Sequence, residues 1–182
     1  MPLHVCGAYR HTTAVYARDA TYGILPYMES VFIGVHAGIG ELGAIAFLWV
    51  FIELLDPNAA RTRRAHIAAF IGALSLWVSW IVGGYYYVVY YGSNVKPVIK
   101  EGPLPWAHLV VTETKEHVFL FLPFLAILVL GLIIAHRKEL NGGRRIQSIL
   151  VLSLLVFLIG MAMAGLGYTI SSGFRSAIEA NV

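Results

Sequence analysis

The stretch that decides the fold is residues 118–135, VFLFLPFLAILVLGLIIA, a run of eighteen residues with no charged or strongly polar side chain. About 18 consecutive apolar residues are enough for a helix to cross the hydrocarbon core of a bilayer. Three further segments, at about 26–55, 66–91 and 146–170, repeat the pattern with few polar interruptions. The chain is therefore predicted to be an all-α membrane protein, a bundle of four transmembrane helices.

The composition supports this class. Of the 182 residues, 58% are hydrophobic and 13% are charged, whereas a soluble domain carries about 25% charged residues. Four helices of this length predict a single domain covering residues 1–182, with a polar tail at 1–23 that lacks the apolar centre of a cleavable signal peptide. The net charge of +3 is carried by short loops beside the apolar segments, so no nucleic-acid partner is expected.

The positive side chains give the expected orientation. Two short loops, 56–65 and 137–145, hold Arg61, Arg63, Arg64, Arg137, Lys138, Arg144 and Arg145. Cytoplasmic loops are enriched in Lys and Arg, so both loops are predicted to be cytoplasmic and both termini external, an N-out/C-out topology. The expected location is the cytoplasmic membrane of a bacterium, with lipid as the immediate environment.

The third helix is predicted at about 105–140, with Pro105 as its first residue and a bend at Pro123. Proline suits the first turn of a helix, where its missing N–H has no partner to lose. A helix of this length would reach about 50 Å, more than a bilayer needs. Its first turns are therefore expected to extend on the non-cytoplasmic side.

Two histidines suggest a cofactor. His36 lies 19 residues before Leu55, and His117 lies 19 residues before His136, at the cytoplasmic ends of the first and third helices. At 1.5 Å per residue, both imidazoles sit about 28 Å above that surface. Two facing imidazoles at one level are what a b-type haem needs as axial ligands. We expect His36 and His117 to hold haem iron.

Glycines near that level would leave flat space for a planar ligand, and polar side chains at the outer edge would hydrogen-bond the haem propionates. The expected cofactor-binding residues, besides the two histidines, are Gly34, Gly38, Gly84, Tyr85, Tyr168 and Lys115. The alternative is that Gly34 and Gly38 form a small-xxx-small helix-packing motif, with His36 a hydrogen-bonded packing residue and no cofactor.

A second alternative is a bare transition-metal ion, held with the two histidines by Glu29 and Glu113, with His108 as an extra ligand. Bundle di-iron sites use Glu-x-x-His, and the sequence Glu-Thr-Lys-Glu-His at 113–117 departs from that spacing. Glu41 falls near the bilayer midplane, about 140° around the helix from His36. It is expected either to handle protons or to hydrogen-bond a neighbour such as Ser75 or Ser79.

These features favour an electron-transfer subunit, like a membrane b-type cytochrome, that links the quinone pool to an extracytoplasmic partner through one haem near the outer surface. It would be a non-catalytic subunit of an oxidoreductase complex, with other membrane or extracytoplasmic subunits and quinone as partners. The alternatives are a structural anchor subunit of a larger complex and a metal-binding or metal-transport protein. Cys6 is the only cysteine, which excludes a covalent CxxCH haem site, and no Gly-x-Ser-x-Gly or Walker loop is present.

Overall fold

A computed structural model describes residues 25–180 of the chain, with side chains from Ser30 onward. The regular secondary structure of this part is all helical, without strands. In chain order the elements are α2 (Leu25–Leu54), α3 (Ala59–Tyr86), η2 (Tyr87–Val95), α4 (Lys96–Glu101), η3 (Ala107–Thr112), α5 (Glu113–Phe119), α6 (Leu122–Ala135), α7 (Arg137–Asn141) and α8 (Gln147–Glu179). Within the described residues, four helical stretches are long and apolar enough to cross a membrane, as the sequence predicts.

The first two helices form a hairpin with a short turn. Asn58 caps α3, its side-chain oxygen accepting hydrogen bonds from the backbone N–H groups of Ala60 (3.0 Å) and Arg61 (3.1 Å). Because of this cap, the second helix begins at Ala59 instead of near His66. It also runs past residue 91, through the π-helical segment η2 and into α4, where a loop was expected.

The third helix is not one continuous rod, and the expectation of an extended third helix is not supported. Residues 107–141 form four successive segments, with interruptions at 120–121 and at His136. The first interruption comes just before Pro123, which lies in the first turn of α6. Proline has no N–H to donate back to the preceding turn, so a helix readily restarts there. The first segment, η3, has π-helical hydrogen bonding.

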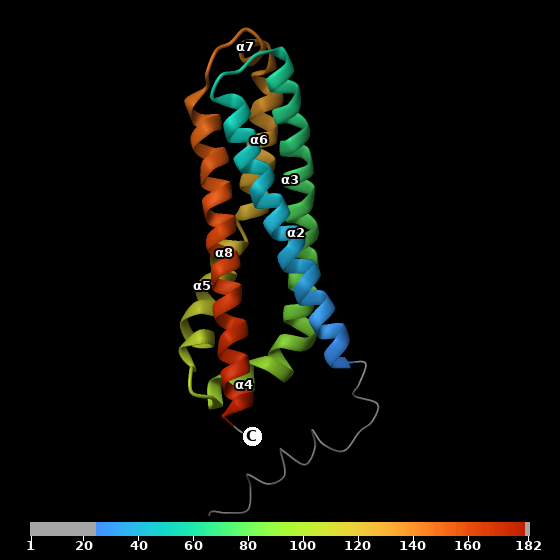
Figure 1. Cartoon of the computed structure of the whole chain (residues 1–182), viewed down its shortest axis with the longest axis vertical. Coiled ribbons are helices and arrows are strands. Elements are labelled where there is room, and N and C mark those ends of the chain that lie inside the picture. Colours follow the sequence, from blue (N-terminus) through green and yellow to red (C-terminus); the bar gives the residue numbers. More distant parts are fainter. Residues whose placement is uncertain (1–24, 181–182) are drawn as a thin grey trace, which may run out of the picture.

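The bundle is elongated, with α7 at one end and α4 at the other (Figure 1). We call these the α7 end and the α4 end. The two arginine-rich loops lie together at the α7 end. Gly143 has a φ of 85°, and a Cβ built on it would lie 3.7 Å from the Pro57 carbonyl oxygen of the other loop. The C-terminal end of α8 lies at the α4 end.

Helix α8 runs along most of this length and contacts other elements through small residues. A Cβ on Gly160 would lie 2.6 Å from Ala44 Cβ of α2, and one on Gly173 would lie 2.6 Å from Ala107 Cβ of η3. Close approach at small residues is a common way for membrane helices to associate. The fourth helix continues past residue 170, where it was expected to end, to Glu179, and this added part packs on η3 at Gly173.

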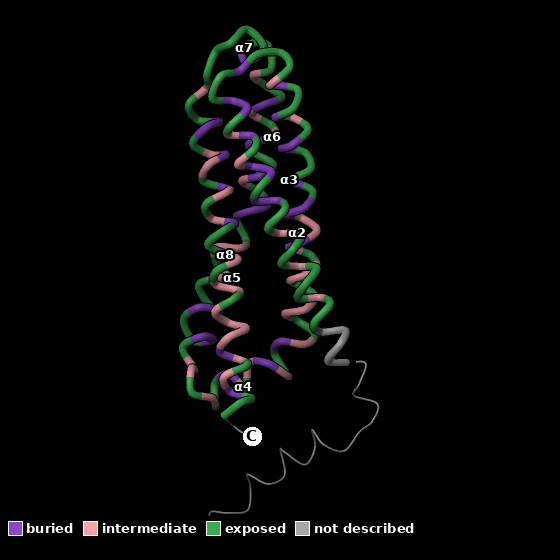
Figure 2. Tube along the Cα trace, in the orientation of Figure 1, coloured by how far each residue is buried: buried purple, intermediate pink, exposed green. Residues whose placement is uncertain are grey.

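The buried side chains form two separate cores. The larger lies toward the α7 end, where residues such as Phe47, Val50 and Val129 are fully buried. The smaller lies at the α4 end, around Tyr91 and Ile99. Figure 2 shows the buried positions concentrated toward the two ends, with half-buried and exposed positions between them. We call this middle part, around residues 34–41, 80–85, 113–117 and 165–169, the intercore region.

Candidate functional site

His36 lies in the intercore region and is held by α3. Its Nδ1 lies 2.8 Å from the Ser79 carbonyl oxygen, and the Ser79 hydroxyl donates to the His36 carbonyl at 2.8 Å. A carbonyl oxygen only accepts hydrogen bonds, so the proton of the neutral ring is on Nδ1. Nε2 is then left with a free lone pair.

The same ring fits closely against its neighbours. A Cβ on Gly83 would lie 2.5 Å from His36 Nδ1, so only glycine leaves room for the imidazole at this position. On another side, the ring of Phe119 meets the imidazole edge-on, with centroids 5.5 Å apart and planes at 80°. Because Phe119 ends α5, this contact brings the end of α5 to the level of His36, two residues from His117.

His117 is held by its own helix. Its Nδ1 lies 2.6 Å from the Glu113 carbonyl oxygen, one turn earlier on α5, and its side chain is exposed. Nδ1 therefore carries the proton and Nε2 is free, as in His36. A metal-bound histidine almost always donates its other ring N–H to a carbonyl, a carboxylate or water. Both histidines expected to bind haem iron have their Nδ1 engaged in this way.

The glycines of the region divide into two groups. A Cβ on Gly34, Gly38 or Gly84 would have nothing within 4 Å. By contrast, one on Gly40 would lie 2.8 Å from Ser79 Oγ, and one on Gly43 would lie 2.9 Å from Leu76 Cγ. Gly40 and Gly43 therefore lie on the face of α2 that packs against α3, whereas the Gly34–Gly38 pair does not pack against another described helix of this chain.

The three side chains expected at the haem edge have different neighbours. Lys115 Nζ lies 3.0 Å from the position that a Cβ on Gly167 would occupy. The positive charge of Lys115 also acts on His36. Tyr168, 71% exposed, has its ring 5.9 Å from the Arg175 guanidinium carbon. Tyr85 is half exposed and packs against Phe32, with ring centroids 5.4 Å apart. Of the three, Lys115 is the one linked to the surroundings of His36.

A second polar cluster lies at the α4 end, where η2 meets η3. The Tyr91 hydroxyl oxygen lies 3.0 Å from His108 Nδ1 and 2.8 Å from Thr112 Oγ1, and the Thr112 hydroxyl donates to the Ala107 carbonyl at 3.0 Å. His108 Nε2 lies 3.8 Å from Glu113 Oε1. We call Tyr91, His108, Thr112 and Glu113 the Tyr91 network. Tyr91, His108 and Thr112 are all buried.

The bare-metal hypothesis receives no support from this arrangement. Within residues 30–180, no group of three or more His, Cys, Asp or Glu side chains is placed to hold a metal ion. His108 and Glu113 lie beside one another in the Tyr91 network. The side chain of Glu29 lies outside the described residues. Glu41 is exposed on α2, and the Ser79 hydroxyl that was considered as its partner serves His36 instead.

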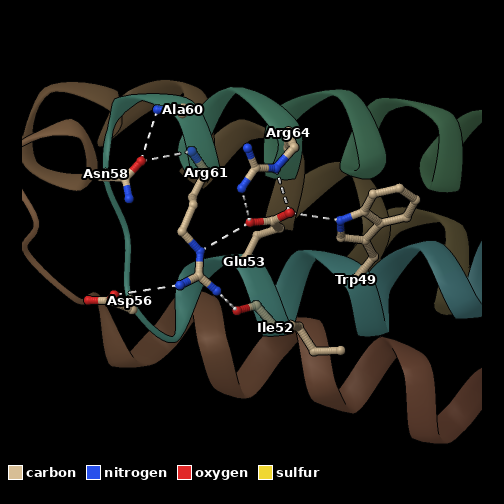
Figure 3. A network of polar contacts seen from close by, with 8 residues as sticks. All are labelled: Trp49, Ile52, Glu53, Asp56, Asn58, Ala60, Arg61 and Arg64. Atoms are coloured by element: carbon tan, nitrogen blue, oxygen red, sulfur yellow. Dashed lines mark hydrogen bonds and ion pairs between the residues drawn. The ribbon is translucent and has the colours of Figure 1, made fainter.

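A third polar cluster closes the α7 end. The buried carboxylate of Glu53 accepts hydrogen bonds from Trp49 Nε1 at 3.0 Å, from Arg61 Nε at 3.1 Å and from Arg64 Nε at 2.7 Å (Figure 3). Arg61 also donates to the Ile52 carbonyl at 2.7 Å. These bonds tie the last turns of α2 to the first turns of α3, so Glu53 stabilises the hairpin.

The sequence singled out His36 and His117 but did not predict their contacts: Ser79 was considered as a partner of Glu41, and Glu113 as a metal ligand. Ser79 and Gly83 lie one turn apart on α3, and two small residues in an apolar helix are a weak signal among many others. No sequence spacing predicts the Tyr91 network, because Tyr91 lies before residues 92–106 and the other members of the network lie after them. Comparison of the chain with protein-family models, curated proteins and solved structures finds no match.

Proposed function

We propose that this chain is a b-type cytochrome-like membrane subunit that binds one haem between His36 and His117 in the intercore region. The main support is that both imidazoles have Nδ1 fixed on a backbone carbonyl and Nε2 free to bind iron. Gly34, Gly38 and Gly84 add open space without side chains at this level. Lys115 would offset the negative charge of a propionate.

A haem with two axial histidines supplies a one-electron couple without an open coordination site for substrate. The protein's own residues would orient the His36 ring and pack around it. Ser79 and Gly83 fix the plane of the His36 ring, and Phe119 packs against its edge. We propose that the subunit passes electrons between the quinone pool and an extracytoplasmic partner as the non-catalytic part of an oxidoreductase complex.

The absorption spectrum tests this proposal. Purified protein should show a Soret band whose reduced-minus-oxidised difference is typical of a haem with two histidine ligands. His36→Ala and His117→Ala should each abolish or shift the band. His136→Ala is the control, because His136 pairs with Glu139 at 2.6 Å at the α7 end. A wild-type protein without the band, or unchanged spectra in both variants, would remove the assignment.

The proposed topology places the α7 end in the cytoplasm and the α4 end outside, giving N-out/C-out, in a bacterial cytoplasmic membrane. Its support is the concentration of arginine in the two loops that meet at the α7 end. Alkaline phosphatase, which is active only outside the cytoplasm, should be active when fused after Val182 and inactive when fused in the loop at 142–145. The reverse pattern would invert the topology.

The second candidate is a structural subunit that assembles with other membrane helices. The observation in its favour is that Gly34 and Gly38, one turn apart on α2, have no packing partner among the described residues. That face could receive a helix of another subunit as readily as a haem. Purified protein that contains no haem but co-purifies with a fixed membrane partner would favour this function.

A further inference from the structure

The α7 end carries more positive side chains than its own carboxylates can pair. In the segments 53–66 and 136–145, seven Lys and Arg residues stand against three carboxylates. Three of the seven form ion pairs with these carboxylates, namely Arg61, Arg64 and Arg144. The other four are exposed and make no ion pair within the described part of the chain: Arg63, Arg137, Lys138 and Arg145.

Arg63 is the one unpaired cation of this end that lies on a membrane-length helix. Its neighbours Arg61 and Arg64 reach the Glu53 carboxylate at 3.1 Å and 2.7 Å and close the hairpin with α2 (Figure 3). Arg63 takes no part in that network. Helical residues three, four and seven positions apart share a face, so Arg63 lies on the same face of α3 as residues 66, 67 and 70.

A groove lies on that face, one to two turns beyond Arg63. Its volume is about 270 Å³, and it is lined by His66, Ile67 and Phe70. Ile67 and Phe70 are 50% and 57% exposed, so no other described segment of the chain covers these apolar walls. Leu74, one turn further on the same face, is 56% exposed. Apolar walls of this kind favour a hydrocarbon chain over water.

The cation and the groove follow one another in the order of the parts of a phospholipid. Because α3 begins at Ala59, Arg63 lies close to the loop, and Phe70 lies further into a helix long and apolar enough to cross a membrane. The seven residues between them span about 10 Å along the helix axis. A guanidinium group binds phosphate through two parallel N–H donors, and the groove next to it can take the start of an acyl chain.

The surrounding charge favours an anionic lipid over a zwitterionic one. Helix α7 packs against α3 and carries the unpaired Arg137 and Lys138. The carboxylates of this end, Glu53, Asp56 and Glu139, already lie against arginine or histidine side chains. The positive potential is therefore not cancelled locally, and it would repel the cationic headgroup of a zwitterionic lipid.

We propose that Arg63 and the groove formed by His66, Ile67 and Phe70 bind one anionic phospholipid, such as phosphatidylglycerol. Its phosphate contacts the Arg63 guanidinium, and one acyl chain lies in the groove. The site is separate from the intercore region. It depends neither on the haem assignment nor on which end of the bundle faces the cytoplasm.

The test measures the thermal unfolding midpoint of the full-length protein in detergent as one compound is added. The three compounds are phosphatidylglycerol, phosphatidylcholine with the same acyl chains, and inorganic phosphate. Phosphatidylglycerol should raise the midpoint at a concentration at least about fivefold lower than phosphatidylcholine. Inorganic phosphate should have no effect, because it has no chain for the groove. Equal effects of the two lipids, or an equal effect of inorganic phosphate, would overturn the proposal.

Two arginine variants separate a site from a diffuse basic surface. Arg63→Gln should raise the half-saturating concentration of phosphatidylglycerol about fivefold and leave that of phosphatidylcholine unchanged. Arg145→Gln is the matched control, since Arg145 is an exposed, unpaired arginine of the same end in the loop before α8. Its effect should stay within about twofold at physiological salt, where exposed charges further away are screened. Equal losses in the two variants would overturn a site at the groove.

A third variant tests the groove itself. Ile67→Trp puts a larger ring into the space between His66 and Phe70. Because the acyl chain would lose its place, the half-saturating concentrations of both lipids should rise at least about fivefold. Wild-type affinity for phosphatidylglycerol in Ile67→Trp would show that the groove does not hold the chain and would overturn the proposal.

Discussion

His36 and His117 each donate Nδ1–H to a backbone carbonyl oxygen, whereas His108 has Nδ1 3.0 Å from the Tyr91 hydroxyl and Nε2 3.8 Å from Glu113 Oε1. The sequence predicted one depth for His36 and His117 from residue number, but that argument assumes a continuous third helix, and the interruption at 120–121 lies between His117 and His136. The sequence could not predict the bonds of the rings, because one partner is a carbonyl on a different helix and another is a tyrosine on the far side of a connection. The chemistry of each histidine depends on those bonds.

Gly83 is the residue on which the position of the His36 ring depends most directly. In Gly83→Ala, the new methyl group would meet Nδ1 at 2.5 Å and its neighbour Cε1 at 2.6 Å, so the ring would have to leave its bond to Ser79. We expect a loss of about 1–3 kcal/mol in unfolding free energy, as is typical of overpacking, together with a changed haem spectrum. Thermal unfolding in detergent and the Soret band measure the two effects.

Gly131→Ala is the matched control, since a Cβ on Gly131 of α6 would have nothing within 4 Å. Replacing an exposed helical glycine by alanine should leave stability unchanged or raise it by up to about 1 kcal/mol. If Gly83→Ala behaved like this control in both measurements, the ring of His36 would not be held where we describe it.

At the scale of elements, the existence of four spans followed from their hydrophobicity, while the breaks within them did not. The second span was predicted to end at about residue 91, before Pro97, yet the helix continues through η2 and α4 to Glu101. Proline is compatible with a helix when it falls in the first turn of a new segment, and Pro97 lies there in α4. The π-helical segments have no sequence period of their own, because one extra residue in a turn is set by packing.

The hairpin of α2 and α3 gives a prediction at this scale. Glu53 is 8% exposed and accepts from Trp49, Arg61 and Arg64, so Glu53→Gln would turn one of its acceptor oxygens into a donor facing other donors. We expect the unfolding free energy to fall by about 1–3 kcal/mol, since hydrogen bonds to charged groups are lost. The thermal unfolding midpoint in detergent measures the change.

Asp56→Asn is the control for the same hairpin. Asp56 is 78% exposed on its side chain and lies 3.6 Å from Arg61, a loose surface pair. Its loss should change the unfolding free energy by no more than about 0.5 kcal/mol. Equal effects of the two substitutions would mean that Glu53 is a surface charge like Asp56, and that the buried network does not stabilise the turn.

At the scale of the whole molecule, the division into two cores is the feature that sequence could not provide. Hydrophobicity is high along all four spans, so nothing in the composition marks where neighbouring helices stop packing. In α2, Ala44, Phe47 and Val50 are buried, whereas the stretch from 31 to 42 has no buried position. The gathering of His36, Lys115 and three open glycines in the intercore region becomes meaningful only once this division is known.

The intercore region can be tested as a cofactor space by filling it. Gly38→Leu would place a large apolar side chain where nothing lies within 4 Å of the new Cβ, so the chain itself should fold unchanged. If haem occupies that space, the haem-to-protein ratio should fall about twofold or more, because a planar ligand cannot share it with leucine. Gly131→Leu adds the same side chain to an open position of α6, away from the two histidines, and should keep full haem content. Normal haem content in Gly38→Leu, combined with loss of a co-purifying membrane partner, would instead assign this face of α2 to helix packing between subunits.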